Sequence, residues 1–395
     1  MKLRGYREED RGAVARVTAT ALGGSVEYWE EEYYEPEKNP RLDPDQVYVV
    51  EEDGEIRATA AVLPLEVFYE GRTVPMGGIA AVATHPAYRR RGYAGELIQA
   101  ALSGMRERNV HLSMLHPFAH SYYRRYGWEL ATEAISYDLK PTDLPTSHEQ
   151  KRVRAYRDKD LPRMMRLLEG EASRHPLFVR RGEVRWRQIF ARGEQEAAVY
   201  DVEGRIEGYL LYTQQAEGYN PPRTLVLSEL VAATPEARRA LISFAAAFDP
   251  TEFAVKYSAP RGEPLHPHLS NSFVKARIDP RFMLRLVSVQ GALGLVDLRR
   301  AADLDMPLII EAEDDLISDN TGEYVVGGNG VVREAEVEER VALDVRQLAQ
   351  LYAGYLSARQ LARQGKLRPN STKALELLEG YFPPSDPYLS PPDDF

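Results

Sequence analysis

The sequence predicts an α/β protein made of two related tandem units followed by a smaller α/β domain. Residues 3–10 (LRGYREED) and 153–160 (VRAYRDKD) share an Arg-x-Tyr-Arg-acidic-x-Asp pattern at an offset of 150. At the same offset, residues 49–62 and 199–212 each read as a strand, a glycine turn and a second strand. Because both pairs keep their order and register, we interpret them as two copies of one unit.

A third pair of segments, residues 77–98 and 227–242, matches more loosely because the second copy is shorter. Residues 139–150 (LKPTDLPTSHEQ) contain two prolines and few apolar residues, which is typical of a linker. We therefore expect domains over residues 1–140, 151–280 and 285–395.

The last hundred residues predict the smaller domain. Residues 307–312 and 322–326 read as strands, and residues 345–362 have apolar side chains at helical spacing, which predicts one helix. A second helix is expected over residues 370–382. The proline-rich tail, residues 383–395, is expected to be extended.

Composition excludes several classes of protein. The 395 residues carry 50 Lys and Arg against 60 Asp and Glu, a formal charge of −10, which disfavours nucleic acid or an anionic membrane as the main partner. There is no cysteine, so disulfides, thiolate catalysis and Cys-ligated metals are excluded. The charged N-terminal segment and the lack of any apolar run of about 18 residues predict no membrane span. We expect a cytoplasmic protein.

The segment that indicates chemistry is residues 77–102. An apolar strand over residues 79–84 runs into a proline-containing turn, then Arg89-x-x-Gly92-x-Ala94-Gly95, and then an amphipathic helix. The first N–H groups of a helix lack intrahelical partners and lie at the positive end of its dipole. Small residues let those amides approach a phosphate closely. We interpret this turn as an anion cradle, although it matches neither a P-loop nor a dinucleotide fingerprint.

The second unit lacks the cradle. Its corresponding segment, residues 231–244 (VAATPEARRALISF), has no glycine and adds Glu236. We therefore expect that the second unit does not bind the cofactor.

The cradle sequence, R-x-x-G-x-A after V-A-T-x-P, resembles the acetyl-CoA motif of the GCN5-related N-acetyltransferases (GNAT). Residues 118–131 (FAHSYYRRYGWELA) resemble the F-Y-x-x-x-G-F segment of that family. Two tandem units, a smaller third domain and a C-terminal Phe resemble the "enhanced intracellular survival" (Eis) type. That resemblance implies a sterol-carrier-protein-like (SCP2-like) third domain and a homo-oligomer, a hexamer.

The resemblance also implies roles for individual residues. Tyr123 would be the general acid that protonates the departing thiolate, with Tyr122 as the alternative, and the α-carboxylate of Phe395 would be the general base. The pKa values near 8.5 for a thiol and 10 for a phenol are compatible with that proton transfer. The residues expected to bind acetyl-CoA are Val82, Ala83, Thr84, Arg90, Arg91, Gly92, Tyr93, Ala94, Gly95, Phe118 and Ala119.

We therefore expect an acetyl-CoA-dependent N-acetyltransferase, an acyltransferase acting on a primary amine of an aminoglycoside, a polyamine or a lysine side chain. Two other functions remain open: a non-catalytic acyl-CoA-binding module, and a lipid carrier acting through the third domain. The acidic and aromatic residues 27–35 (EYWEEEYYE) are either an exposed helix face or the wall of a pocket for a cationic substrate. His85, His116 and His120 lack zinc-ligand spacing, so we expect no metal.

Overall fold

The computed structural model describes residues 1–191, 193, 195–216, 223–296, 306–327, 330–332 and 337–395. Its internal contacts divide the chain into two compact units. Unit 1 consists of residues 1–131, 282–385 and 395, and unit 2 consists of residues 132–281 and 386–394. The boundaries of three separate domains stay a prediction.

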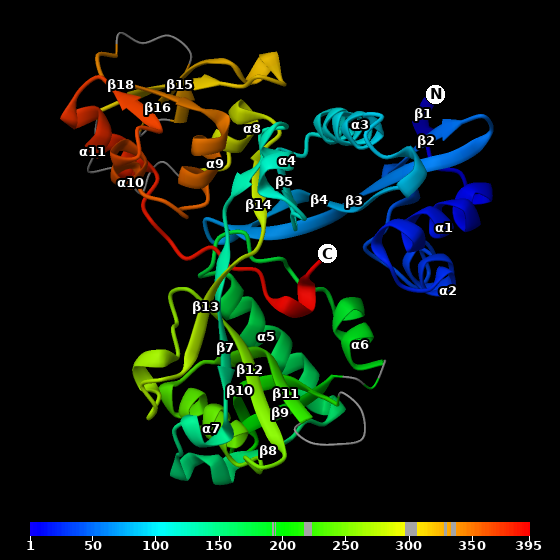
Figure 1. Cartoon of the computed structure of the whole chain (residues 1–395). Helices are drawn as coiled ribbons and strands as arrows, with labels where there is room; N and C mark the ends of the chain where they lie inside the picture. The colour runs from blue at the N-terminus through cyan, green and yellow to red at the C-terminus, as the bar shows by residue number, and fades with distance from the viewer. Residues whose placement is uncertain (192, 194, 217–222, 297–305, 328–329, 333–336) are drawn as a thin grey trace. The chain divides into compact units, whose positions relative to one another are not determined.

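Unit 1 begins with a sheet whose strands follow the order β1-β2-β3-β4-β5-β14-β6. Helices α1 and α3 pack on its long strands β3 and β4, one on each face (Figure 1). The strands are β1 (Lys2–Gly5), β2 (Val47–Glu52), β3 (Glu55–Tyr69), β4 (Arg72–Thr84), β5 (Leu112–Leu115), β6 (Glu129–Leu130) and β14 (Met283–Leu286). The helices are α1 (Arg11–Leu22), α2 (Val26–Tyr28), α3 (Tyr93–Glu107) and α4 (His120–Arg124).

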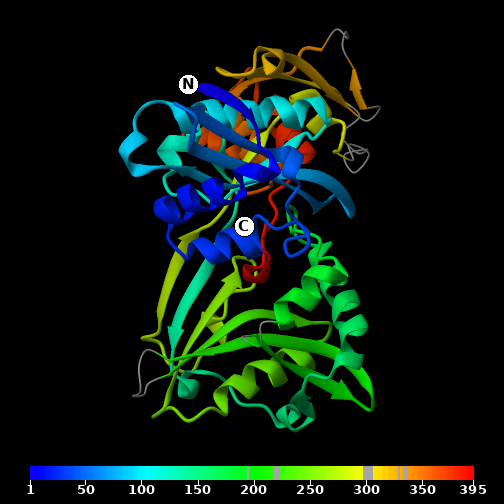
Figure 2. The ribbon, with the colours of Figure 1, turned by 90° about the vertical axis from the view of Figure 1, so that its right-hand side faces the viewer.

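Unit 2 repeats this architecture with the strand order β13-β7-β12-β11-β10-β9-β8. Helices α5 and α7 both pack on the central strands β10 and β11 (Figure 2). The strands are β7 (Glu133–Leu139), β8 (Val153–Ala155), β9 (Glu196–Val202), β10 (Arg205–Gln215), β11 (Arg223–Ala232), β12 (Phe253–Pro260) and β13 (Lys275–Pro280). The helices are α5 (Leu161–Ala172), α6 (Glu183–Ala191) and α7 (Pro235–Ala246).

Two strands lie in a different sheet from their sequence neighbours. Strand β14 follows the second unit in sequence but lies between β5 and β6: Met283 pairs with both Leu115 and Leu130. Strand β7 comes before the expected linker in sequence and lies between β12 and β13. Each sheet is therefore completed by a segment from the far side of the linker.

The remaining part of unit 1 is a smaller sheet with the order β17-β16-β15-β18-β19. Its strands are β15 (Leu308–Glu313), β16 (Gly322–Gly327), β17 (Gly330–Val332), β18 (Arg340–Asp344) and β19 (Leu367–Pro369). Its helices are α8 (Val289–Leu293), α9 (Val345–Tyr352), α10 (Ala358–Arg363) and α11 (Thr372–Tyr381). The strands and the last helix agree with the sequence analysis.

The single helix expected over residues 345–362 is wrong. Helix α9 ends at Tyr352, Gly354 takes a left-handed conformation (φ 67°), and α10 begins after the capping box of Ser357 and Gln360. A left-handed glycine just past the last turn is a common helix terminator. The apolar spacing continues across the break because each short helix buries apolar side chains, Leu348 and Tyr352 in α9 and Leu361 in α10.

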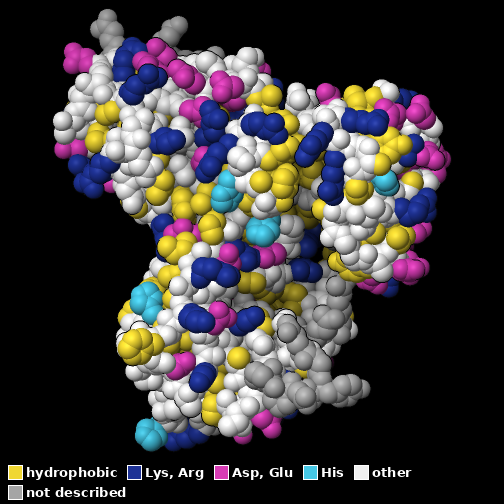
Figure 3. Space-filling view, in the orientation of Figure 1, with side chains coloured by type: hydrophobic (Ala, Val, Ile, Leu, Met, Phe, Trp, Pro, Cys, Tyr) yellow, Lys and Arg dark blue, Asp and Glu magenta, His cyan; other side chains and the backbone are white. Residues whose placement is uncertain are grey.

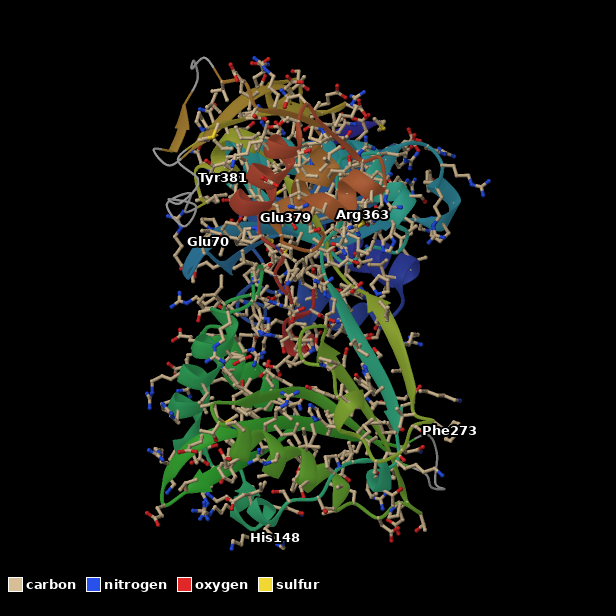
Figure 4. All side chains as sticks on the ribbon, turned by 90° about the vertical axis from the view of Figure 1, so that its left-hand side faces the viewer. Glu70, His148, Phe273, Arg363, Glu379 and Tyr381 are labelled. Carbon is tan, nitrogen blue, oxygen red and sulfur yellow. The ribbon has the colours of Figure 1, made fainter. Side chains whose placement is uncertain are left out.

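The β3–β4 hairpin contacts this smaller sheet domain. Glu70 marks the hairpin tip, where the chain turns between Tyr69 and Arg72 (Figure 4). The rings of Tyr69 and Tyr352 stack in parallel at 4.3 Å, and the Tyr69 hydroxyl donates to the Tyr352 carbonyl oxygen. Charged side chains of both signs are interspersed over the face shown in Figure 3. Within the described residues, no helix combines the length and apolarity needed to cross a membrane.

Candidate functional site

The anion cradle predicted from the sequence forms at the start of α3. Gly92 is the N-cap residue, with φ 88° and no side chain to cap the helix. The amides of Gly95 and Glu96 already donate to the Gly92 carbonyl oxygen, which leaves the first-turn amides of Tyr93 and Ala94 without an intrahelical acceptor. The local backbone therefore presents N–H groups at the positive end of a fifteen-residue helix.

Arginine side chains surround this helix start. A hollow of about 780 Å³ opens over it, and Arg89, Arg90 and Arg125 line it together with Gly92, Tyr93, Ala94 and Gly95. Arg91 is turned elsewhere: its guanidinium lies 3.2 Å from Glu52 and over the ring of Tyr88. Arg90, and not Arg91, thus faces the hollow.

Strands β4 and β5 separate beside the cradle. Their parallel pairing ends at Ile79 and Leu115, so residues 80–84 of β4 have no partner on β5. A register shift against β3 and a positive φ at Ala81 mark the place where β4 bends. Val82 and Thr84 line the hollow, whereas the Ala83 side chain is buried. A free strand edge of this kind can pair with an extended polar ligand.

An aromatic wall faces that strand edge. It comes from the segment before α4, from α4 and from the turn after it, and its members on the hollow are Phe118, Tyr122 and Tyr126. The Phe118 side chain is 74% exposed, and its ring lies 5.1 Å from that of Tyr122. Arg125 stacks on the Tyr122 ring at 4.7 Å, which adds a cation to the wall. Ala119 is the N-cap of α4 and is not part of the lining.

The two candidate acids occupy different environments. Tyr122 lines the hollow, and its pKa is raised by burial and by Tyr126. Tyr123 is only 4% exposed and packs with Ile79 and Leu115, where the two strands begin to separate. Burial raises the pKa of Tyr123 to about 12, so its phenol stays protonated at neutral pH.

The Phe395 ring is docked on strand β4. A Cβ atom on Gly78 would lie 2.7 Å from the Phe395 ring, so only glycine leaves room for the ring at this place. The centroid of the Phe282 ring lies 5.0 Å from that of the Phe395 ring. Gly78 precedes Ile79, the last β4 residue that pairs with β5. The C-terminal residue thus lies beside the point where the strands separate.

The sequence analysis missed several lining residues. Ala21 and Leu22 at the end of α1, and Tyr88 and Arg89 before the cradle, face the hollow, as do Arg125 and Tyr126. Arg89, Arg125 and Tyr126 stand inside the motifs already recognised, so spacing alone could have identified them. None of residues 27–35 lines this hollow, although Trp29 and Tyr33 lie in ring contact at 4.7 Å. Among the described residues no cluster of three His, Asp or Glu side chains could hold a metal ion.

Comparison with known families decides the class of protein. Residues 2–131 and 170–286 match two family models, each described as an acetyltransferase (GNAT) domain, and residues 289–390 match a sterol carrier protein domain. The chain carries two GNAT acetyltransferase domains and a sterol carrier protein domain. A curated relative from Streptomyces avermitilis, named an uncharacterized N-acetyltransferase, is 25% identical over 343 residues, which is 78% of each chain. The three-domain GNAT protein is therefore an acyltransferase enzyme.

Solved structures share its whole fold. A GCN5-related N-acetyltransferase from Anabaena variabilis matches with a TM-score of 0.83 and 22% identity, and Eis1 from Mycobacterium abscessus matches with 0.78 and 20%. Both alignments cover 100% of both chains. At such identities the likeness is one of fold. The predicted fold class, two GNAT-fold domains and a smaller sterol-carrier-like α/β domain, is confirmed, as is the family resemblance.

Proposed function

We propose that this GNAT protein transfers the acetyl group of acetyl-CoA to a primary amine. The observation that carries the proposal is the combination of a glycine-capped helix start with a free strand edge in one hollow. The pyrophosphate would lie on the amides of Tyr93 and Ala94 with Arg89 and Arg90 around it. The pantetheine arm, which carries amides, would pair with the β4 edge at Val82 and Thr84.

This arrangement offers one residue for each proton transfer of the reaction. The amine nitrogen attacks the thioester carbonyl, a carbon–nitrogen bond forms, and the carbon–sulfur bond breaks. Tyr123 donates its phenolic proton to the departing thiolate, supported by its position beside Ile79 and Leu115. The Phe395 carboxylate takes the ammonium proton, directly or through water, and its docked ring supports a fixed position for that charge.

The acceptor is proposed as a cationic primary amine, of an aminoglycoside, a polyamine or a lysine side chain. Its support is the family resemblance; the acidic segment after α1, in which Glu27, Glu31 and Glu32 are exposed, does not line the hollow and adds only negative charge to the surface of the same unit. A homo-oligomer, a hexamer by resemblance, and a cytoplasmic location remain part of the proposal. Light scattering of the purified chain tests the assembly.

A screen of amines with acetyl-CoA tests the activity. Because the chain contains no cysteine, a thiol reagent reads only the CoA that is released, with no signal from the protein. We expect thiol release that depends on both the amine and the enzyme. Acetyl-CoA binding without release on any amine would instead favour a non-catalytic binding module. A longer acyl donor that outperforms acetyl-CoA would correct the donor and keep the reaction class.

A further inference from the structure

The second GNAT domain carries a basic hollow, and the matching positions of the first domain have the opposite balance of charge. The hollow encloses about 480 Å³, between β8, the start of α5 and the β9–β10 turn. Small-ligand pockets have volumes in this range. Five cationic side chains line it against only two carboxylates, Asp160 and Asp201; the cations are Arg154, Lys159, Arg163, Arg166 and Arg205.

The internal repeat supplies a reference for this hollow. In the first domain, Arg4 holds Asp10 at 2.7 and 2.9 Å and Glu51 at 2.8 Å. In the second, Arg154 holds Asp160 at 2.7 and 3.0 Å and Asp201 at 2.8 Å. This framework, one arginine held by two carboxylates, is thus the same in both copies. A difference in the side chains around it is therefore a difference in surface chemistry and not in fold.

The residues around this framework differ in charge. At an offset of 150, Lys159 replaces Glu9, Arg163 replaces Ala13 and Arg205 replaces Glu55, while Arg166 matches Arg16. The equivalent surface of the first domain therefore has two cations against four carboxylates. The replacements change an acidic surface into a basic one.

Three of the five cations are not neutralised by the framework. Arg154 is held by its two carboxylates, and Arg205 pairs with Glu207 at 2.5 Å. The Arg163 Nε donates to the Ile206 carbonyl oxygen at 2.9 Å, which fixes the guanidinium at the rim of the hollow. Within the described residues, Lys159, Arg163 and Arg166 take part in no ion pair.

We propose that this hollow binds a small ligand carrying two phosphate groups or a diphosphate. A fixed guanidinium matches the oxygen geometry of phosphate, and the exposed side chains of Lys159 and Arg166 add positive charge to the lining. A concave site of this size fits a small molecule, and a net charge of −10 disfavours a long polyanion. The site is separate from the cradle of the first domain and does not depend on the proposed activity.

Calorimetry with sodium pyrophosphate tests the site. The full chain is first loaded with one molar equivalent of acetyl-CoA, so that the cradle is filled without excess diphosphate in solution. We expect one further saturable site per chain, whose affinity falls as salt is raised. The double variant Lys159→Glu with Arg163→Ala introduces the residues of the first copy, and it should weaken pyrophosphate binding at least tenfold. Acetyl-CoA affinity and the melting temperature should stay unchanged.

A matched variant separates the site from the overall charge. Lys256→Glu with Arg187→Ala makes the same change in net charge on exposed residues of unit 2 outside the hollow. Its pyrophosphate affinity should stay within twofold. Equal weakening in both variants, or no saturable binding to the acetyl-CoA-loaded protein, would overturn the proposal. Should the double variant misfold, the exposed Lys159→Gln alone should still weaken binding measurably, and unchanged affinity would refute the site.

Discussion

The two GNAT domains share a fold but differ at the start of the helix that follows their central strand pair. Helix α3 begins after a bare glycine in a left-handed conformation, with arginines around it. Helix α7 begins with Pro235, which has no N–H, and Thr234 caps the Ala237 amide at 3.2 Å. Glu236 adds a carboxylate that pairs with Arg239. The second helix therefore satisfies its own first turn.

The clefts between the strands differ as well. In unit 2, β11 and β12 pair only as far as Leu227 and Tyr257. Beyond that point the tail of the chain fills the gap: the Tyr388 hydroxyl donates to the Ser258 carbonyl oxygen, and Ser390 donates to Glu229. Two separate features, a capped helix and a segment of the same chain, therefore distinguish the second cleft from the first, and we expect each of them to oppose cofactor binding.

The largest effect is expected from a substitution that removes the ion pairs of the C-terminal tail. Arg181 is fully buried and pairs with Glu229 at 2.6 Å and Asp393 at 2.7 Å. Because Arg181→Met removes the cation that both buried carboxylates share, the free energy of unfolding should fall by about 3–5 kcal/mol. Chemical denaturation measures it, with Arg187→Met as an exposed control. Acetyl-CoA should still bind once per chain, and a stoichiometry of two would show that the tail alone closes the second cleft.

The helix caps can be tested with paired substitutions. Gly92→Asp and Gly92→Asn both tolerate a positive φ and differ in one charge. We expect Gly92→Asp to weaken acetyl-CoA binding at least about 100-fold, because a carboxylate would face the phosphates, and Gly92→Asn only a few-fold. At the corresponding cap of α7, Thr234→Asp and Thr234→Asn should leave the affinity for acetyl-CoA unchanged. Calorimetric titration decides, and equal loss in both Gly92 variants would point to backbone strain instead of charge.

The acid is tested by removing one oxygen. Tyr123→Phe should lower kcat at least about 30-fold while the Kd for acetyl-CoA stays within a few-fold, since general acid catalysis contributes about 10²–10⁴-fold. Tyr122→Phe, the neighbour on the hollow, is the control and should lose little. The reverse pattern in steady-state kinetics would move the role to Tyr122.

The terminal carboxylate is tested by displacement. A short Gly-Ser extension after Phe395 keeps every side chain, and kcat/KM should fall at least about tenfold through loss of a positioned group. Asp393 and Asp394 are the competing bases, but they pair with Arg181 and Arg281. Full activity of the extended chain, with loss in Asp394→Asn, would assign the base to that side chain.

The smallest expected effect is a flat alkaline pH profile. Burial raises the pKa of Tyr123 to about 12, so the acid stays protonated, and competent, as pH rises toward that value. We expect kcat to change less than about twofold between pH 8 and 10 for an amine that is already saturating. A sharp loss of kcat as the pH is raised from 8 to 10, measured in steady-state assays, would exclude a buried phenol as the acid.

Local patterns predicted the repeat and the cradle well. The Arg4–Asp10 pair and its copy Arg154–Asp160 join residues that are close in sequence, so a local sequence pattern can reveal them. The glycine cap at Gly92 is local in the same way. Arg91 was expected at the cofactor but turns to Glu52, a partner 39 positions away, which no local pattern reveals.

Long-range placements could not be predicted. The aromatic neighbours of Phe395, such as Phe282, lie more than a hundred positions away, and only a terminal Phe hinted at a docked ring. The break after Tyr352 depended on Gly354, which the apolar periodicity around it concealed. The roles of Tyr123 and Phe395 stay predictions.

The position of β14 has a consequence for synthesis of the chain on the ribosome. Strands β5 and β6 are both made early, yet the strand that joins them, Met283–Leu286, emerges more than 150 residues later. Until then the nascent first sheet exposes two unpaired strand edges, which are sites of edge-to-edge association. The first sheet is therefore complete only after the second domain has been translated, and a fragment ending in the linker would lack the strand between β5 and β6.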